Sequence, residues 1–267
     1  MSLNAQMPAA HIAISCIGDV ATVELVNPAK KNAMTPEMWQ TLQRFAGEVS
    51  GDPTVRAVLI QGRGETFSSG ADIAGFVDGR DGAEGAQAYD DRLEAACAAI
   101  ETIAQPTVAV LSGAVVGAGL ELAASCDLRV AADDVLMMIP AARLGLGFDP
   151  RAIARLARAF GPVMAKELML TGKPLPAERA LGLGALTRCV APERLDAAAA
   201  ELVQTLVANA PLTLRAAKMA LHAAGHGAPS ALMAEAHRLT DAANASDDYR
   251  EGRAAFAEKR PPHFRGH

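Results

Sequence analysis

Short apolar runs alternate with longer amphipathic stretches through the first two thirds of the chain. Residues 12–26 hold two β-branched runs on either side of a Gly-Asp turn, a pattern typical of a β-hairpin. The runs AVLIQ (57–61), TVAVL (107–111) and DLRVA (127–131) are continuous and short, which favours buried strands. Helical stretches separate them, so the pattern predicts an α/β fold of β-β-α repeats around a buried parallel sheet.

The clearest helix start lies at residues 35–37, Thr-Pro-Glu. A threonine cap, a proline at the first helical position and an acidic first turn predict a helix through about Ser50. A second helix is expected from about residue 86 to residue 104, ending before Pro106. The intervening residues 75–85 contain four glycines and four charged side chains, and they are predicted to form a mobile loop.

The pattern changes near residue 195, after which the chain is almost wholly helical. An alanine- and leucine-rich helix is followed by a break at Pro211, a second helix, a Gly/Pro interruption at 225–229 and a last helix. We therefore predict two regions: a core over residues 1–195 that carries the functional site, and a helical region over residues 196–267.

The composition narrows the class of protein. Hydrophobic residues make up 51% of the 267 positions and aromatic residues only 4%, so a large core must be filled by aliphatic side chains. The net charge of −5 argues against nucleic acid or an anionic membrane as the partner. No targeting or membrane-spanning segment stands out, and four scattered cysteines without a C-x-x-C pair indicate reduced thiols. These features predict a cytoplasmic protein.

Candidate chemistry lies in two stretches rich in glycine and small residues, FSSGADI (67–73) and GAVVGAGLEL (113–122). Each places a turn where a strand ends, which leaves backbone N–H groups free to face a ligand, and a helix begins within the second. Two such N–H groups aimed at one oxygen form an oxyanion hole. Ordinary tight turns are the alternative reading. The stretches lack the dinucleotide fingerprint, the P-loop lysine and the G-x-S-x-G nucleophile elbow.

Several motifs together resemble one family. FSSGADI and GAVVGAGLELAASCDLRVA resemble the two oxyanion motifs of the crotonase, or enoyl-CoA hydratase/isomerase, superfamily. PAARLGLG, GKPLPAERALGLG, APLTLRAAK and SDDYREGRAAFAEKRPPHF continue the resemblance in the right order, from about residue 12 to residue 265. The resemblance is specific for the superfamily and less so for the reaction.

The resemblance implies a crotonase-like spiral of β-β-α turns and a helical C-terminal region that trimerises, giving a homotrimer or a hexamer of two trimers. It implies an acyl-CoA thioester as substrate, with coenzyme A as part of that substrate and no metal or redox cofactor. The backbone N–H groups of Ala71 and Ala118 would form the oxyanion hole and stabilise a thioester enolate. Many relatives have glycine in place of Ala118, and a backbone donor tolerates alanine if φ is not strongly positive.

The resemblance also places Glu121 on the position of one catalytic glutamate of the hydratases. Its apolar sequence neighbours are expected to raise its pKa, although a glutamate at a helix start also suits the helix dipole. The second hydratase glutamate is replaced by Ala141, which can neither hold a water molecule nor transfer a proton. Asp149 aligns with an aspartate of the dienoyl-CoA isomerases and is a candidate substitute. The alternative, given equal weight, is that Asp149 caps a helix that starts at Arg151.

Contacts to coenzyme A are matched only in part. Two residues of AFAEKR correspond to C-terminal residues that meet adenine and phosphate, whereas a basic position of many hydratases is Ala74 here. Two histidines four apart, at 222 and 226, are interpreted as surface residues rather than as metal ligands. The full set assigned to coenzyme A is Lys30, Lys31, Asp72, Ile73, Phe256 and Lys259.

The reaction stays open between two alternatives at this point. Glu121 on a hydratase position favours hydration of a 2-enoyl-CoA, and a single acid favours double-bond isomerisation. Decarboxylation and thioester hydrolysis use the same oxyanion hole and are further alternatives. The rival from another class is a member that binds acyl-CoA or RNA without catalysis. The missing glutamate at Ala141 speaks for this rival, and the acidic net charge speaks against RNA.

Overall fold

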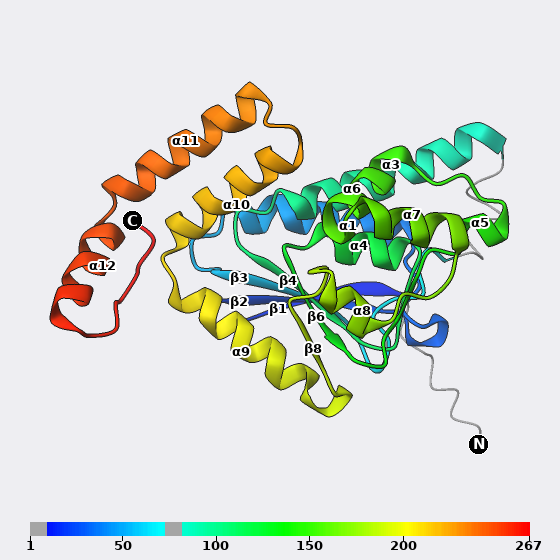
Figure 1. Ribbon diagram of the computed structural model, residues 1–267, viewed down its shortest axis with the longest axis horizontal. Coiled ribbons are helices and arrows are strands. Elements are labelled where there is room, and N and C mark those ends of the chain that lie inside the picture. The colour runs from blue at the N-terminus through cyan, green and yellow to red at the C-terminus, as the bar shows by residue number, and fades with distance from the viewer. Residues whose placement is uncertain (1–9, 73–81) are drawn as a thin grey trace, which may run out of the picture.

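A six-stranded sheet forms the centre of the chain in this computed structural model, which describes residues 10–72 and 82–267 (Figure 1). The strand order is β1-β2-β3-β4-β6-β8, and a separate two-stranded sheet pairs β5 with β7. The strands are β1 (His11–Ile17), β2 (Val20–Val26), β3 (Ala57–Gly62), β4 (Thr107–Leu111), β5 (Ala114–Val116), β6 (Leu128–Ala132), β7 (Leu136–Met138) and β8 (Arg188–Val190).

Helices cover this sheet and continue beyond it. Short 3₁₀ turns precede two of the elements, at Pro28–Lys30 and at Pro192–Arg194. The helices are α1 (Pro36–Ser50), α3 (Gly82–Glu101), α4 (Ala118–Ser125), α5 (Ala141–Leu144), α6 (Pro150–Phe160), α7 (Pro162–Thr171), α8 (Ala177–Gly182), α9 (Leu195–Ala208), α10 (Pro211–Gly225), α11 (Ser230–Ala245) and α12 (Asp247–Glu258).

The pairing of the strands confirms the predicted hairpin and parallel sheet. β1 and β2 are antiparallel, whereas β2, β3, β4, β6 and β8 pair in parallel. The three apolar runs predicted as strands correspond to β3, β4 and β6, within one residue at their ends. Parallel neighbours require a crossover on a face of the sheet, and α1 and α3 supply two such crossovers.

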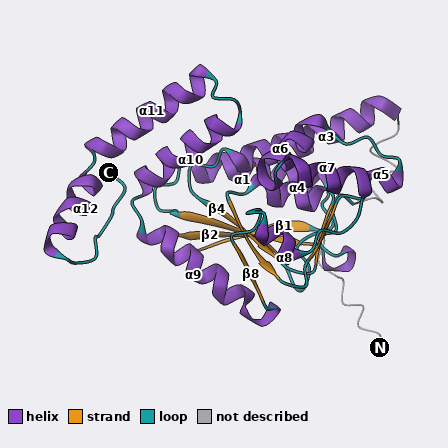
Figure 2. Cartoon of the chain, viewed as in Figure 1, coloured by secondary structure: helices purple, strands orange, loops and turns teal. Residues whose placement is uncertain are grey.

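Both faces of the sheet are buried, which explains why its strands read as continuous apolar runs. Along β4, Ala109 and Leu111 join the core beneath α1, α3 and α4, whereas Val108 and Val110 face α9. Figure 2 shows the strands between α9 on one side and the larger helical layer on the other. The functional site described below lies on the side of the larger layer.

The C-terminal helices differ in what they contact. α9 packs on the sheet through buried residues that include Leu195 and Leu202. α10 and α11 pack on each other, and α11 and α12 extend away from the sheet (Figure 1). The division into regions at residue 195 and the trimerising role of this part stay predictions. No helix in the described ranges is long and apolar enough to cross a membrane.

The first predicted helix is confirmed, and the second begins earlier than predicted. Thr35 caps α1 by accepting the N–H of Met38, and Pro36 is its first residue. α3 starts at residue 82 and ends at Glu101, instead of spanning 86–104. The glycines at the start of α3 favour a loop by their low helix propensity, and the structure nevertheless has them in the helix. The remainder of the predicted mobile loop lies outside the described residues.

Asn32 connects the segments that lead into the site. Its side chain accepts the N–H of Asn27 at 3.0 Å and donates to the carbonyls of Arg63 and Thr66 at 3.0 and 2.6 Å. Its φ of 55° lies in the left-handed region, which asparagine adopts more readily than most residues. The residue is 1% exposed, so its own polar atoms depend on these hydrogen bonds.

We therefore expect Asn32→Ala to lower the free energy of unfolding by about 2–4 kcal/mol, because buried donors and acceptors lose their partner. Urea denaturation followed by circular dichroism measures this change. Asn244→Ala, at an exposed position of α11, is the matched control and should change stability by less than about 0.5 kcal/mol. Equal effects of the two substitutions would contradict the proposed role of Asn32.

Candidate active site

Two loops that are far apart in sequence lie side by side at the ends of their strands. Ser68 and Val115 form a parallel bridge, in which the Ser68 N–H donates to the carbonyl of Ala114 at 3.0 Å and the Val116 N–H donates to that of Ser68 at 3.0 Å. The Gly117 N–H in turn donates to the carbonyl of Met138 at 2.9 Å. The loops that contain the two glycine-rich stretches are therefore held against each other by backbone hydrogen bonds.

Gly70 sits where the two loops are closest. Its φ is 100°, a conformation that side chains rarely adopt. A Cβ at this position would lie 2.7 Å from the Val116 carbonyl oxygen and 3.5 Å from the Ala118 nitrogen. Only glycine permits both this conformation and this approach, and the approach brings Ala71 next to Ala118.

The backbone N–H groups of Ala71 and Ala118 are both available for a ligand. The Met34 N–H donates to the carbonyl of Gly70, and the Asp72 N–H donates to the carbonyl of Met34. The N–H of Ala71, which lies between them, takes no part in this pairing. Ala118 begins α4, where the first N–H groups have no partner within the helix. Within the described ranges, neither N–H donates to another group of the chain. Ala118 does not adopt a positive φ, so alanine is compatible with this position.

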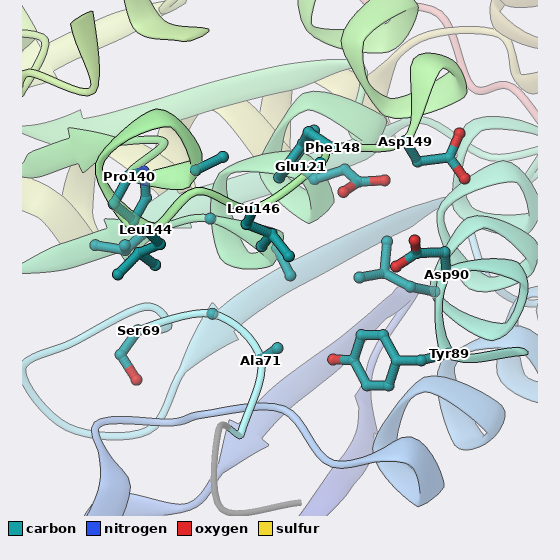
Figure 3. A pocket seen from close by; sticks show the side chains of 17 residues that line it. Ser69, Ala71, Tyr89, Asp90, Glu121, Pro140, Leu144, Leu146, Phe148 and Asp149 are labelled. Carbon is teal, nitrogen blue, oxygen red and sulfur yellow. The ribbon is translucent and has the colours of Figure 1, made fainter. Parts of the chain in front are cut away.

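These residues line a cavity of about 110 Å³. Figure 3 shows the labelled side chains around it, with the carboxyl group of Glu121 turned toward the side on which Tyr89, Asp90 and Asp149 lie. Apolar side chains line much of the rest. The lining residues are Ser69, Gly70, Ala71, Tyr89, Asp90, Leu93, Val116, Gly117, Ala118, Glu121, Pro140, Ala141, Leu144, Leu146, Gly147, Phe148 and Asp149.

Glu121 is the buried acid of this cavity. It lies three residues after Ala118 on α4, so the two residues are on the same face of the helix, and both line the cavity. Its exposed fraction is 2%. Burial raises the pKa of Glu121 to about 8, against the opposing charge of Arg155 and with a contribution from Glu94. The predicted direction of the shift is confirmed.

Arg155 was missed by the sequence analysis. Its Nη1 lies 3.1 Å from Oε1 of Glu121, and its side chain is 2% exposed. The surroundings of Glu121 are therefore not purely apolar, as its sequence neighbours suggested. The sequence did contain a signal for this residue. Arg155 lies at helical spacing from Ala152 and Leu156, on the apolar face of α6, and an arginine on a buried face is unusual unless it is paired.

Asp149 caps α6 and also lines the cavity. Its Oδ1 accepts the N–H of Arg151 at 2.7 Å, and its Oδ2 lies 2.6 Å from Nη2 of the same arginine. The hydrogen bonds from Arg151 lower the pKa of Asp149. The helix begins at Pro150, one residue earlier than predicted. The capping alternative is thus confirmed, and a catalytic role for Asp149 stays a prediction.

Ala141 lies where the resemblance places the second hydratase acid. It is 3% exposed at the start of α5 and lines the cavity beside Pro140. Its methyl group offers neither a hydrogen-bond acceptor nor a proton. The cavity therefore has Glu121 on one hydratase position and an apolar group on the other.

Residues assigned to coenzyme A fall into two groups. Nζ of Lys30 lies 2.7 Å from Oδ2 of Asp72, directly after Ala71. The carbonyls of Lys30 and Lys31 accept hydrogen bonds from Ser69, which lines the cavity. Both lysines are exposed, as expected for residues that would meet phosphate. Ile73 lies outside the described residues.

Phe256 and Lys259 form the second group, on and after α12. Phe256 is 88% exposed, and Lys259 ends the helix with a φ of 56°. Figure 1 shows α12 at the opposite end of the chain from α5, which borders the cavity. Neither residue lines the cavity, and their contact with coenzyme A stays a prediction.

The comparisons agree on one family. The sequence profile described as "Enoyl-CoA hydratase/isomerase" matches residues 17–267. A Mycobacterium bovis protein named "Probable enoyl-CoA hydratase echA6" is 34% identical over 247 residues, covering 92% of this chain and 96% of the relative. A Mycobacterium leprae protein of the same name is 32% identical over 258 residues, covering 96% and 99%.

Solved structures give the same result. An enoyl-CoA hydratase/carnithine racemase from Magnetospirillum magneticum matches with a TM-score of 0.88 at 33% identity, covering 95% of this chain and 94% of that one. An enoyl-CoA hydratase subunit from Geobacillus kaustophilus matches with a TM-score of 0.85 at 32% identity, covering 96% and 98%. This chain therefore belongs to the enoyl-CoA hydratase/isomerase family and has the crotonase fold with its C-terminal helices.

Substitution of Gly70 tests the close approach of the two loops. We expect Gly70→Ala to lower turnover of enoyl-CoA thioesters about 100-fold or more, because the added Cβ meets Val116 and displaces the neighbouring N–H donors. Gly64→Ala is the matched control, since its φ is 79° and its Cβ would meet nothing within 4 Å. Steady-state kinetics on folded variants would measure both. If Gly70→Ala turned over as fast as Gly64→Ala, the close approach would have no part in catalysis.

Proposed function

We propose that this protein is an acyl-CoA-processing enzyme that stabilises a thioester enolate and moves protons on it through Glu121. One observation carries the proposal. The buried carboxyl group of Glu121 lines the same cavity as Ala118 and Ala71, whose backbone N–H groups are free. The family membership supports an acyl-CoA as the substrate. We further propose a cytoplasmic trimer or hexamer that uses no metal or redox cofactor.

The oxyanion hole would act on the thioester carbonyl. In the proposed complex, its oxygen accepts hydrogen bonds from the N–H groups of Ala71 and Ala118. Negative charge builds up on this oxygen when a proton leaves the α-carbon, so both bonds strengthen in the transition state. The N-terminus of α4 adds partial positive charge at the same place. Loss of one such donor typically costs roughly 3–4 kcal/mol of barrier.

Isomerisation is the reaction that suits this cavity best. The Glu121 carboxylate removes a proton from C2 of a 3-enoyl-CoA, the C2–H bond breaks, and its electrons delocalise into a dienolate. The protonated Glu121 then returns the proton to C4, which moves the double bond from C3–C4 to C2–C3. One carboxyl group is sufficient for this sequence, and Ala141 offers no second one on the hydratase position.

Hydration of a 2-enoyl-CoA is the second candidate. The names of the relatives favour it, and Asp149 lies in the same cavity as Glu121. Hydration in the usual way uses two carboxylates to hold the water molecule and manage its protons. Against this role, both oxygens of Asp149 already bind Arg151.

Glu121→Gln tests the proton-transfer role common to both candidates. Glutamine keeps the shape and a hydrogen bond but removes the basicity, so turnover should fall roughly 100- to 10,000-fold with binding nearly intact. Calorimetry gives the affinity, and absorbance assays on 3-enoyl-CoA and 2-enoyl-CoA give the two activities. Asp149→Asn is the companion variant.

The companion separates the candidates. Asp149→Asn should change isomerisation little if Glu121 acts alone, whereas severe and non-additive effects of both substitutions would indicate a working pair. Full activity of Glu121→Gln on a confirmed substrate would contradict the mechanism. Binding of acyl-CoA without any turnover by the natural protein would favour the non-catalytic rival.

The pKa of Glu121 predicts a pH dependence. Isomerisation begins with Glu121 as a base, so only the carboxylate form of the free enzyme reacts. With a pKa of about 8, kcat/KM should rise about tenfold per pH unit below that value and level off above it. Steady-state kinetics between pH 6 and about 9.5 would test this. A fall of kcat/KM above pH 8 would mean that Glu121 starts the reaction as an acid, as in protonation of an enolate formed by decarboxylation.

A further inference from the structure

A cluster of charged side chains lies behind Glu121, on the side away from the cavity. Arg155 is at its centre and contacts three carboxyl groups from α3 and α4. Its Nη1 lies 2.8 Å from Glu94 and 3.1 Å from Glu121, and its Nη2 lies 2.9 Å from Glu94 and 3.1 Å from Glu101. Arg158 reaches the other oxygen of Glu101 at 2.9 Å.

We propose that Arg155 and Glu94 are positioning residues that orient the Glu121 carboxyl group and set its affinity for a proton. This inference goes beyond the proposed function and rests on it only where it concerns catalysis. Neither residue lines the cavity, so neither contacts the substrate. Their effect on the reaction is transmitted through Glu121.

The contacts account for the orientation. A guanidinium group presents its donors in a rigid fork, and Glu94 occupies both arms of this fork through its two oxygens. Glu121 receives one donor, Nη1, at Oε1. Its Oε2 has no hydrogen-bond partner among the described residues. One oxygen is thus anchored, and the other remains available on the side of the cavity.

A count of charges accounts for the proton affinity. Arg155 and Arg158 face Glu94, Glu101 and Glu121, which leaves one carboxyl group in excess. The side chains of Glu94 and Glu101 are 15% and 14% exposed and that of Glu121 is 3% exposed, so burial penalises a negative charge most at Glu121.

Other groups near Glu121 add to this balance. Asp90 and Asp149 raise its pKa through their negative charge, and Arg151 holds Asp149 in its charged form. Burial raises the pKa of the Cys97 thiol well above its usual value, so Cys97 adds no charge. The titratable and charged groups that act on Glu121 are Arg155, Glu94, Asp149, Asp90 and the uncharged Cys97, while Glu101, Arg151 and Arg158 contact members of this set or each other.

Removal of the charge on Glu94 should therefore shift the titration of Glu121. In Glu94→Gln, Arg155 keeps its charge but loses its bidentate partner, and Glu121 becomes a principal counter-ion. The substitution removes the negative charge that raises the pKa of Glu121 and leaves Arg155 with one fewer carboxylate to neutralise, so we expect Glu121 to titrate at a lower pH, by about one pH unit. Glutamine is nearly isosteric with Glu94 and keeps one oxygen that can accept a hydrogen bond from Arg155.

The experiment reads the protonation of Glu121 directly. Infrared difference spectra between each protein and its Glu121→Gln derivative, recorded across pH without substrate, follow the carboxyl C=O band of this one residue. Glu94→Asp keeps the charge and should remain close to the natural protein. Glu167→Gln is the matched control, because Glu167 binds Arg179 with both oxygens at 2.6 and 2.7 Å on the surface. It should leave the titration unchanged.

The outcomes separate this inference from the proposed function. An unchanged Glu121 titration in Glu94→Gln, or a shift of equal size in Glu167→Gln, would overturn the inference. If Glu94→Gln fails to fold, Glu101→Gln takes its place, with a smaller downward shift expected and no shift overturning the inference. A shifted titration supports it, even if Glu121→Gln retains full turnover and so contradicts the proposed function.

Discussion

The site depends on the close approach of two chain segments, residues 68–71 and 115–118. Backbone hydrogen bonds between Ser68 and its neighbours in β5 hold the segments together, and Gly70 allows them to approach because it has no side chain. The approach places two unpaired N–H groups side by side, and it does so next to the start of α4, where a helix dipole is strongest. The parallel strands behind them are buried on both faces, so the segments rest on a rigid base. A preorganised donor pair of this kind stabilises charge without reorganisation during the reaction.

The carboxyl groups of the cavity differ from the hydratase pattern of two catalytic glutamates. Glu121 is present and holds its proton up to about pH 8, because it is buried and shares its arginine with two other carboxyl groups. Ala141 removes one carboxylate, and Arg151 engages Asp149. Both features, at Ala141 and at Asp149, favour chemistry that a single proton carrier performs. Hydration with Asp149 as the second acid would require Asp149 to break its hydrogen bonds with Arg151 when the substrate binds.

Much of the fold could be predicted from local pattern, whereas contacts between distant elements could not. The strands β3, β4 and β6 could be predicted, because strands buried on both faces contain almost only apolar residues. Asp149 could also be predicted as a helix cap, because an aspartate followed by a proline is a local signal of a helix start. Arg155 lies 34 positions after Glu121 and meets it only through the packing of α6 on α4, which no local pattern encodes. The start of α3 could not be predicted, because glycines at a helix start have the same local signal as glycines in a loop.

Solvent exchange on a substrate that cannot react further tests the central claim most directly. A short saturated thioester such as butyryl-CoA has α-protons but no double bond, so an enzyme that forms a thioester enolate can only exchange them with the solvent. Proton NMR in D₂O follows the loss of the α-proton signal with time. The account predicts exchange catalysed by the natural protein, and little or none by Glu121→Gln, although both bind the thioester. Equal exchange by both proteins, or none by a natural protein that binds butyryl-CoA and turns over enoyl-CoA, would contradict it.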